Sequence, residues 1–463
     1  MAKPVKQIKY LCLLVKKRYA DTHSLQTIQL AWPLVITQVG HILTGIVDNM
    51  FLGQLGAVEQ AAGIVSNNLY TLLLVFTIGV SYASTPLVTA AKEESDLLKQ
   101  TSLFKNSLYL NFGIAFLCFL VLFFASGLLV HLKQPIEVTT LAIPFFNVLI
   151  FSMLPVSFFF TGKQYCEGLS NTRIALVISI SGNLINVLLN YALIYGKLGL
   201  PEMGYMGSAW ASFIARSCMG IGFLVYLFQS PFTKEIRRYF FKVKVNLKDL
   251  ANLTRIGLNA GLQFTFEVAA FSVAGLMAGR FGKEHIDAHG IALNLAAFTY
   301  MFASGISGAA TIRAGTFKAQ NNWHEVKSAA LAASRLVLTA MGVFAFLFLA
   351  GASVLPLAFS AEPDIIKLTS QLLVIAAMFQ LFDGLQVTMI GILRGLDDVR
   401  VPTYVTLVAY WGVAIPLAYF FAFPMGMKTT GIWLALLAAL ALVAIALSMR
   451  LYVLIKRNIR PVD

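Results

Sequence analysis

The stretch "QVGHILTGIVDNMFLGQLG", residues 38–56, is an apolar run that carries one carboxylate, Asp48, about two turns before its end. Apolar runs of this kind are typical of helices that cross a lipid bilayer. An ionised carboxylate at such a depth costs about 3 kcal/mol on insertion scales, so it is rare unless the protein uses or pairs it. Asp48 is therefore the first candidate functional residue.

The composition of the whole chain agrees with a membrane protein. The 463 residues are 58% hydrophobic and 12% charged, with a mean hydropathy of +0.77. A soluble domain has about 25% charged residues. The net charge of +14 does not indicate a nucleic-acid partner, because the basic residues lie in short stretches between apolar runs, where they set topology. We expect the lipid bilayer as a partner and no nucleic acid.

Twelve apolar runs are long enough to cross about 30 Å of hydrocarbon at about 1.5 Å per helical residue. We therefore predict an all-α integral membrane protein with twelve spanning helices. The expected spans are 28–52, 63–90, 104–132, 139–162, 172–195, 207–229, 254–280, 288–314, 327–359, 367–392, 402–423 and 430–456.

The basic residues predict the orientation. With the N-terminus inside, 28 of the 35 Lys and Arg fall in inner segments, six fall in outer loops, and Arg216 lies within a span. This excess predicts that both termini are cytoplasmic. The expected organisation is a basic N-terminal tail (1–27), an N-lobe (28–229), a basic cytoplasmic linker (230–253), a C-lobe (254–456) and a cytoplasmic tail (457–463).

An internal repeat relates the two lobes. "LGQLG" at 52–56 matches "AGRFG" at 278–282, 226 residues later. Further matches are Thr85 with Thr311, Lys92 with Lys318, and "GLSNTR" at 168–173 with "GLDDVR" at 395–400. Six helices thus repeat as six, and an even number keeps both copies in one orientation. Parallel repeats of this kind occur in transporters.

Three carboxylates interrupt the predicted spans: Asp48, Glu267 and Asp383. Each could pair with a buried Arg or Lys and brace helices, or each could bind a proton or another cation. Burial disfavours the charged form of a carboxyl group, so such an acid can load and release a proton. The repeat places Ala274, His41 and Val156 opposite these acids, so the acids break the symmetry, which an architectural role would not require.

Amides and a histidine accompany the acids. Asn186 and Asn190 are four residues apart and share one helix face. They can brace helices, or they can present oxygens to a hard cation, with Asp48 as the third ligand. His41 lies mid-span and can titrate near neutral pH, although a structural histidine is the favoured interpretation. Arg216 needs an acidic or carbonyl partner, which the sequence does not identify.

Other motifs argue against catalysis. "HIDAH" at 285–289 has metal-like spacing, but we expect it in a solvated outer loop. The four cysteines, Cys12, Cys118, Cys166 and Cys218, lack CxxC spacing and are expected to be reduced packing residues. The chain has no GxxxxGK[ST], HExxH or GxSxG motif. We therefore expect no enzyme and no cofactor, and an ion gradient as the energy source.

Several of these segments together resemble the multidrug and toxic-compound extrusion (MATE) transporters, in their bacterial NorM-like branch. They are "LAWPLVITQVGHILTGIVDNMFLGQLG", "FEVAAFSVAGLMAGRFG", "AHGIALN", "SGAATIRAG" and "LFDGLQVTMIGILRGLDDVRVP". The resemblance covers nearly the whole chain. It implies two lobes in a V around a central cavity, and export of lipophilic organic cations in exchange for Na⁺ or H⁺ across a bacterial inner membrane.

The resemblance also implies roles for the site residues. Asp48, Asn186 and Asn190 match the N-lobe cation site, which could take Na⁺. Glu267 and Asp383 match C-lobe acids that bind the coupling ion, the substrate or both. We add His41, where some relatives carry Gln, as a substrate contact, and we expect a monomer. Two alternatives are a lipid-linked oligosaccharide flippase of the same superfamily, which should have a basic cavity, and a membrane-embedded enzyme, for which no constellation is visible.

Overall fold

The computed structural model describes residues 22–132 and 135–459, and within them regular structure is entirely helical. Residues 1–21 of the predicted N-terminal tail, with Cys12, lie outside these ranges, and residues 22–27 of that tail belong to the first helix. The first half contains α2 (Thr22–Leu55), α3 (Ala57–Ser81), α4 (Ser84–Glu93), α5 (Leu97–Ala125), α6 (Ile136–Phe151), α7 (Met153–Gly168), α8 (Thr172–Ile194) and α9 (Tyr205–Gln229), with a 3-10 helix at Ser126–Leu132.

The second half follows a short helix, α10 (Lys234–Phe240), and a 3-10 turn at Pro231–Thr233. It contains α11 (Leu247–Ala278), α12 (Lys283–Ala319), α13 (Trp323–Ala350), α14 (Pro363–Gly395), α15 (Arg400–Leu407), a π-helix (Val408–Ala414), α16 (Ile415–Ala422) and α17 (Lys428–Ile459), with 3-10 turns at Gly279–Phe281 and Leu355–Ala358. The predicted linker is shorter than expected, because α11 begins at Leu247.

The prediction of twelve spans is confirmed. Of the described helices, eleven are long and apolar enough to cross a membrane, and the pair α6 and α7, bent by 41°, makes a twelfth. Large apolar side chains such as Phe124 and Leu276 stay exposed on the outer surface, at 77% and 74%, as expected of residues that face lipid.

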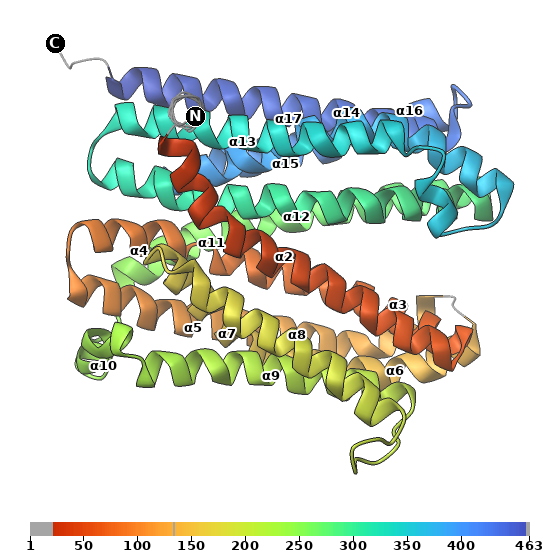
Figure 1. Ribbon diagram of the computed structural model, residues 1–463, viewed down its shortest axis with the longest axis horizontal. Coiled ribbons are helices and arrows are strands. Elements are labelled where there is room, and N and C mark those ends of the chain that lie inside the picture. Colours follow the sequence, from red (N-terminus) through yellow and green to blue (C-terminus); the bar gives the residue numbers. More distant parts are fainter. Residues whose placement is uncertain (1–21, 133–134, 460–463) are drawn as a thin grey trace, which may run out of the picture.

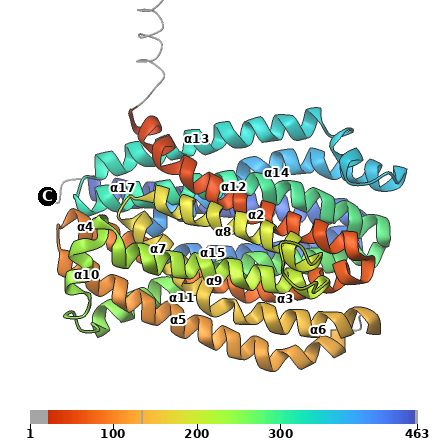
Figure 2. The same ribbon diagram turned by 60° about the horizontal axis from the view of Figure 1, so that its bottom comes forward.

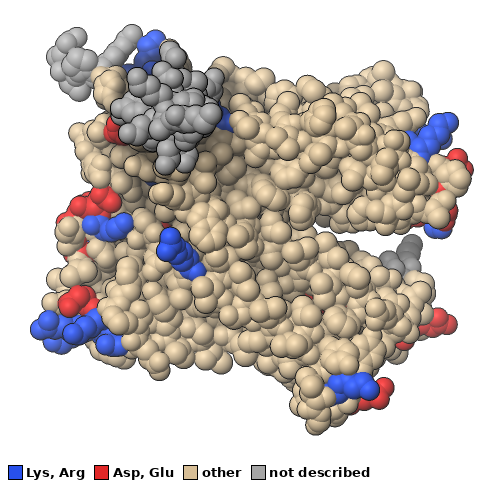
Figure 3. Space-filling view, in the orientation of Figure 1, with Lys and Arg blue, Asp and Glu red and all other residues tan. Residues whose placement is uncertain are grey.

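The helices form two bundles, which we call the N-lobe (α2–α9) and the C-lobe (α11–α17) (Figure 1). The first helix of each lobe crosses to the other one: α2 packs on α12, and α11 packs on α3 (Figure 2). The start of α2 and the end of α17 lie at the same end of the molecule, here called the termini end. A cleft separates the lobes at the opposite end (Figure 3).

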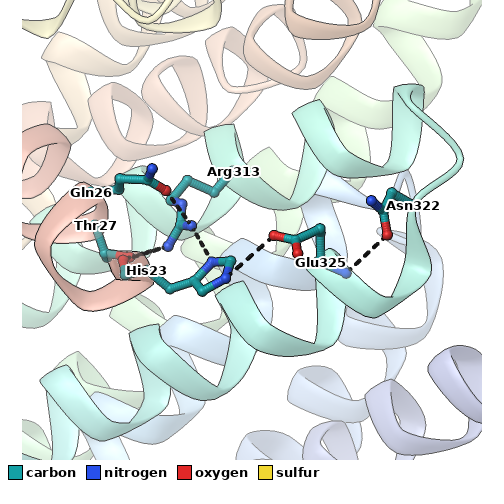
Figure 4. Close-up of polar contacts among 6 residues, drawn as sticks. All are labelled: His23, Gln26, Thr27, Arg313, Asn322 and Glu325. Atoms are coloured by element: carbon teal, nitrogen blue, oxygen red, sulfur yellow. Dashed lines mark hydrogen bonds and ion pairs between the residues drawn. The ribbon is translucent and has the colours of Figure 1, made fainter. Parts of the chain in front are cut away.

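Glycines let the lobes meet closely toward the termini end. A Cβ atom on Gly79 of α3 would lie 2.6 Å from the Cα atom of Gly261 in α11, so only glycine fits there. The start of α2 is also tied to the C-lobe, because Arg313 donates to the His23 carbonyl (2.6 Å), Thr27 Oγ1 (2.7 Å) and Gln26 Oε1 (3.0 Å) (Figure 4). His23 Nε2 lies 3.3 Å from Glu325 Oε2.

The repeat is visible in matching hydrogen bonds. Thr85 Oγ1 donates to the Gln164 carbonyl (3.1 Å), and its counterpart Thr311 donates to the Gly391 carbonyl (2.8 Å). The matching lysines also agree, since Lys92 Nζ bonds Ser170 and Lys318 Nζ bonds Asp397. Each lobe is therefore built on the same contacts between its second and fourth membrane spans. These spans are α3–α4 and α6–α7 in the N-lobe, and α12 and α14 in the C-lobe.

Candidate functional site

The N-lobe brings Asp48 together with both predicted amides. Asp48 Oδ1 accepts a hydrogen bond from Asn190 Nδ2 (2.7 Å), and Asp48 Oδ2 accepts one from Ser212 Oγ (3.2 Å). Asn190 Nδ2 also donates to Asn186 Oδ1 (3.2 Å), and Asn186 Nδ2 donates to Ser212 Oγ (3.4 Å). All four side chains are buried. The prediction that the amides face Asp48 is confirmed.

Local sequence explains how α2 and α8 approach so closely here. Residues 186 and 190 are one turn apart on α8, so both face α2. Gly40 of α2 has no side chain, and a Cβ atom there would lie 2.7 Å from Asn183 Nδ2. Ser212 enters from α9, which packs along α8. Ser212 was not among the candidates predicted from the sequence. Its position in a stretch of small residues within a span could have indicated a close helix contact.

Arg216 lies one turn after Ser212 on α9 and is only half-buried. Its Nη1 donates to Ser152 Oγ (2.8 Å), and its guanidinium lies 4.6 Å from the centre of the Tyr70 ring. It also interacts with Asp48 by charge, without a hydrogen bond between them. The expected acidic partner is thus Asp48, which acts by charge alone, while a hydroxyl and an aromatic face make the direct contacts with the guanidinium.

His41 is not part of the Asp48 cluster. Its ring contacts Phe159 and Phe160, with ring centres 6.0 Å and 6.3 Å away. Its Nε2 atom is buried and has no hydrogen-bond partner in the described part of the chain. These contacts fit a packed histidine as well as a substrate contact, so the role of His41 stays a prediction.

The C-lobe holds a second acidic cluster. Glu267 Oε1 of α11 accepts hydrogen bonds from Gln386 Nε2 (3.0 Å) and from the Tyr410 hydroxyl (3.2 Å). Asp383 lies one turn before Gln386 on α14 and interacts with Glu267 by charge. Glu267 is 8% exposed and Asp383 is 3% exposed. Both acids therefore lie inside the protein and do not face lipid.

A local change of helix type places Tyr410. Residues 408–414 form a π-helix between α15 and α16, a rare form that is frequent at functional sites. The adjacent Trp411 donates from Nε1 to the Phe266 carbonyl (3.1 Å), which ties this segment to α11 next to Glu267. The sequence gives no period that predicts a π-helix, so Tyr410 was not a candidate.

Three basic residues counted as inner-segment charges are buried in helices instead. Lys163 (4% exposed) lies in α7, Arg313 (5%) in α12 and Arg394 (5%) in α14. Lys163 was misplaced because its span was predicted to end at residue 162, whereas α7 continues to Gly168. The same error hid Glu167, a buried acid 3.9 Å from Lys163.

These buried cations lie where the lobes meet. Lys163 Nζ donates to Gln38 Oε1 (3.1 Å), and Gln38 Nε2 donates to Ser304 Oγ of the C-lobe (3.0 Å). The Arg394 guanidinium of the C-lobe lies 4.5 Å from the centre of the Tyr82 ring of the N-lobe. Both cations are thus occupied by contacts within or between the lobes.

The solvated loop predicted for "HIDAH" is also wrong. Residues 285–289 form the first turns of α12. His285 Nδ1 lies 2.8 Å from Thr429 Oγ1, and the buried His289 accepts a hydrogen bond from Trp433 Nε1 (3.1 Å). Across the described residues, no group of three or more His, Cys, Asp or Glu could hold a metal ion.

A family model named MatE matches two segments of the chain, residues 33–192 and 260–420. One segment lies within each lobe, and together they cover more than half of the sequence. The chain belongs to the MatE family. The position of the two matches agrees with the repeat found in the sequence, since the same model fits each half.

Two curated relatives of this MatE chain share the name "Probable multidrug resistance protein NorM". The one from Pseudomonas putida is 30% identical, over 91% of this chain and 92% of that protein. The one from Agrobacterium fabrum is 28% identical, over 95% and 96%.

Solved MATE structures have the same fold. The eukaryotic MATE transporter AtDTX14 aligns with a TM-score of 0.86 at 17% identity, over 94% of this chain and 97% of that one. The Vibrio cholerae MATE transporter VcmN in its bent form aligns with a TM-score of 0.81 at 17% identity, over 94% and 98%. These structures show that the MatE chain has the twelve-helix MATE fold, and its family is one of transporters and not of enzymes.

Proposed function

We propose that this MatE protein is a secondary active multidrug exporter that moves lipophilic organic cations in exchange for Na⁺ or H⁺. The names of its relatives support multidrug efflux. The observation that carries the proposal is that each lobe holds a buried acid bonded to neutral donors, Asp48 in the N-lobe and Glu267 in the C-lobe. Among the described residues, none of Asp48, Glu267 and Asp383 has a Lys or Arg nitrogen within 4.0 Å of its carboxylate. Intramembrane acids without a direct ion pair are typical of ion or proton sites.

In this proposal the lobes divide the work. Asp48, with Asn186, Asn190 and Ser212, binds the coupling ion in the N-lobe. Glu267 and Asp383 bind the cationic substrate, the coupling ion or both in the C-lobe. The Tyr410 ring lies beside Glu267 and packs against Phe271, with ring centres 5.9 Å apart. Aromatic faces next to acids attract organic cations through charge and cation–π contacts without demanding one shape.

The transport cycle follows from the two ends of the molecule. The lobes are packed together at the termini end, through Gly79 and Gly261 and through Arg313. They are apart at the other end. We place both termini in the cytoplasm of a bacterial cell, with the protein in the inner membrane, so the cleft faces outward. Alternating access then requires the contacts at the termini end to open. Because one chain contains both sites, we propose that the protein works as a monomer.

Proteoliposomes containing the purified protein and ethidium test this function. Ethidium should leave its starting compartment when a Na⁺ or an H⁺ gradient is imposed separately, and should stay when neither is present. Asp48→Asn vesicles serve as the inactive control. Movement of a lipid-linked oligosaccharide without any ethidium flux would overturn the proposal in favour of the flippase.

A further inference from the structure

Arg216 and Asp48 are linked through α9. Ser212, whose Oγ bonds Asp48 Oδ2 at 3.2 Å, lies one turn before Arg216 on the same helix face. The Arg216 guanidinium is held by Ser152 Oγ at 2.8 Å and by the face of Tyr70 at 4.6 Å. Neither partner carries a charge that could neutralise it. Asp48 is the acid with which Arg216 interacts by charge inside this lobe.

The charge on Arg216 is permanent, because a guanidinium stays protonated in proteins. An ionised Asp48 together with Arg216 is therefore neutral as a pair. An Na⁺ ion bound at Asp48 would add a further positive charge close to the guanidinium. At the low effective dielectric constant of a protein interior, this repulsion is much larger than it would be in water.

The oxygen atoms of the cluster are also engaged. Both Asp48 oxygens accept hydrogen bonds, and Asn186 Oδ1 accepts one from Asn190. Asn190 Oδ1 is the buried oxygen that has no partner within the described chain. A hard cation exchanges its hydration shell for a set of oxygen ligands. One free amide oxygen, next to a carboxylate whose charge Arg216 offsets without a direct bond, is a poor replacement for that shell.

The C-lobe provides the contrast within the same molecule. Glu267 and Asp383 are two acids that interact with each other by charge. The direct partners of Glu267 are the amide of Gln386 and the hydroxyl of Tyr410, both neutral. No Lys or Arg accompanies them in the way that Arg216 accompanies Asp48, as far as the described residues show.

We propose that Arg216 is a tethered counter-ion of Asp48 that keeps Na⁺ out of the N-lobe site. This inference rests on the proposed role of Asp48 as the coupling-ion residue. It assigns a selectivity function to a residue that binds neither the ion nor the substrate. It also predicts that any Na⁺ affinity of the protein belongs to the C-lobe.

The test measures Na⁺ binding to the purified full chain, separately from transport. Thermal unfolding and isothermal titration calorimetry are carried out with NaCl, using KCl at equal ionic strength as the reference. Three proteins are compared: wild type, Arg216→Met, which removes the charge at similar volume, and Arg216→Lys, which keeps it. Lys163→Met is the matched control, because Lys163 is a buried N-lobe cation whose charged partner is Glu167 rather than Asp48.

The Arg216→Met variant should gain an Na⁺ site, with affinity roughly tenfold or more above that of the N-lobe in wild type. The site should disappear in the double variant Asp48→Asn/Arg216→Met. The Arg216→Lys and Lys163→Met variants should not gain it. These binding results stand whether or not ethidium transport is observed.

Two results would overturn the inference. One is an Na⁺ site in the wild-type protein that the Asp48→Asn substitution removes. This result requires no Arg216 variant, so it remains decisive if those variants fail to fold. The other is an Na⁺ site in Arg216→Met that persists after Asp48→Asn. A loss of ethidium transport with the expected Na⁺ binding would contradict the proposed function but not this selectivity role.

Discussion

The two lobes share a framework but differ in their charged centres. Equivalent threonines, Thr85 and Thr311, bond equivalent carbonyl groups, and the helices that follow begin with equivalent caps at Asp96 and Asn322. In contrast, Asp48 of the N-lobe has a nearby guanidinium, whereas Glu267 and Asp383 of the C-lobe interact with each other by charge and neutral groups donate to Glu267. The two lobes thus share the hydrogen bonds that hold their helices together and differ in the charged residues that we propose to bind ions. We therefore expect the lobes to perform different steps.

The largest expected effect is the loss of transport when Asp48, the acid of the N-lobe cluster, is replaced. Asp48→Asn should abolish gradient-driven ethidium export, because the cluster with Asn186, Asn190 and Ser212 then has no group that changes charge when it binds an ion. The protein should still fold, since an amide oxygen can accept the bond from Asn190. Export by vesicles and the melting temperature measure the two effects.

Asp364→Asn, an exposed acid at the start of α14, is the matched control and should export normally. Near-normal export by well-expressed Asp48→Asn would remove the N-lobe from the coupling step and leave the C-lobe to perform it alone.

The next effect concerns the C-lobe acids. Glu267→Gln and Asp383→Asn should each weaken binding of a cationic dye more than binding of a neutral dye of similar size, because only the cation loses Coulomb attraction in a low-dielectric site. Fluorescence titration of both dyes measures the ratio. Equal losses for both dyes, together with a lower melting temperature, would show that these acids brace helices.

A smaller effect is expected at Tyr410. Tyr410→Phe removes one hydroxyl donor to Glu267 while Gln386 continues to donate. A hydrogen bond to a charged group contributes about 1.5–3 kcal/mol, and the remaining donor compensates for part of it. We expect cation affinity to change less than in Glu267→Gln. Tyr404→Phe, an exposed tyrosine of α15, should bind as wild type; an equal change there would dissociate the effect from the Glu267 cluster.

The smallest effects test the common framework. Thr85→Val and Thr311→Val each remove one buried hydrogen bond between the second and fourth helices of a lobe. Each should lower the stability of its lobe by about 1 kcal/mol, without altering dye selectivity. Denaturation in mild detergent compares the two. A large loss of stability in only one variant would show that the two equivalent hydrogen bonds do not stabilise their lobes equally.

Periodicity and composition were sufficient to predict the twelve spans and the acids in them. The Asp48 cluster was also accessible, because Asn186 and Asn190 have helical spacing within an apolar run. The burial of Lys163 and Glu167 could not be predicted from the sequence, because α7 extends beyond the apolar residues and packs charged side chains between the lobes. Tyr410 depends on a π-helix, and His289 on contact with Trp433, which lies 144 positions away in sequence. Local sequence carries no record of such distant partners.

The exchange of first helices between the lobes has a consequence for the origin of the chain. A protein of one repeat alone would expose the face of its first helix that here packs on the opposite half. Two such copies would cover these faces for each other around a twofold axis, so an ancestor of half the length would have been stable as a homodimer. In a homodimer of that kind, every substitution would appear in both sites at once. In the present chain, where residues 230–246 join the two halves, an arginine can lie beside one acid without affecting the other site.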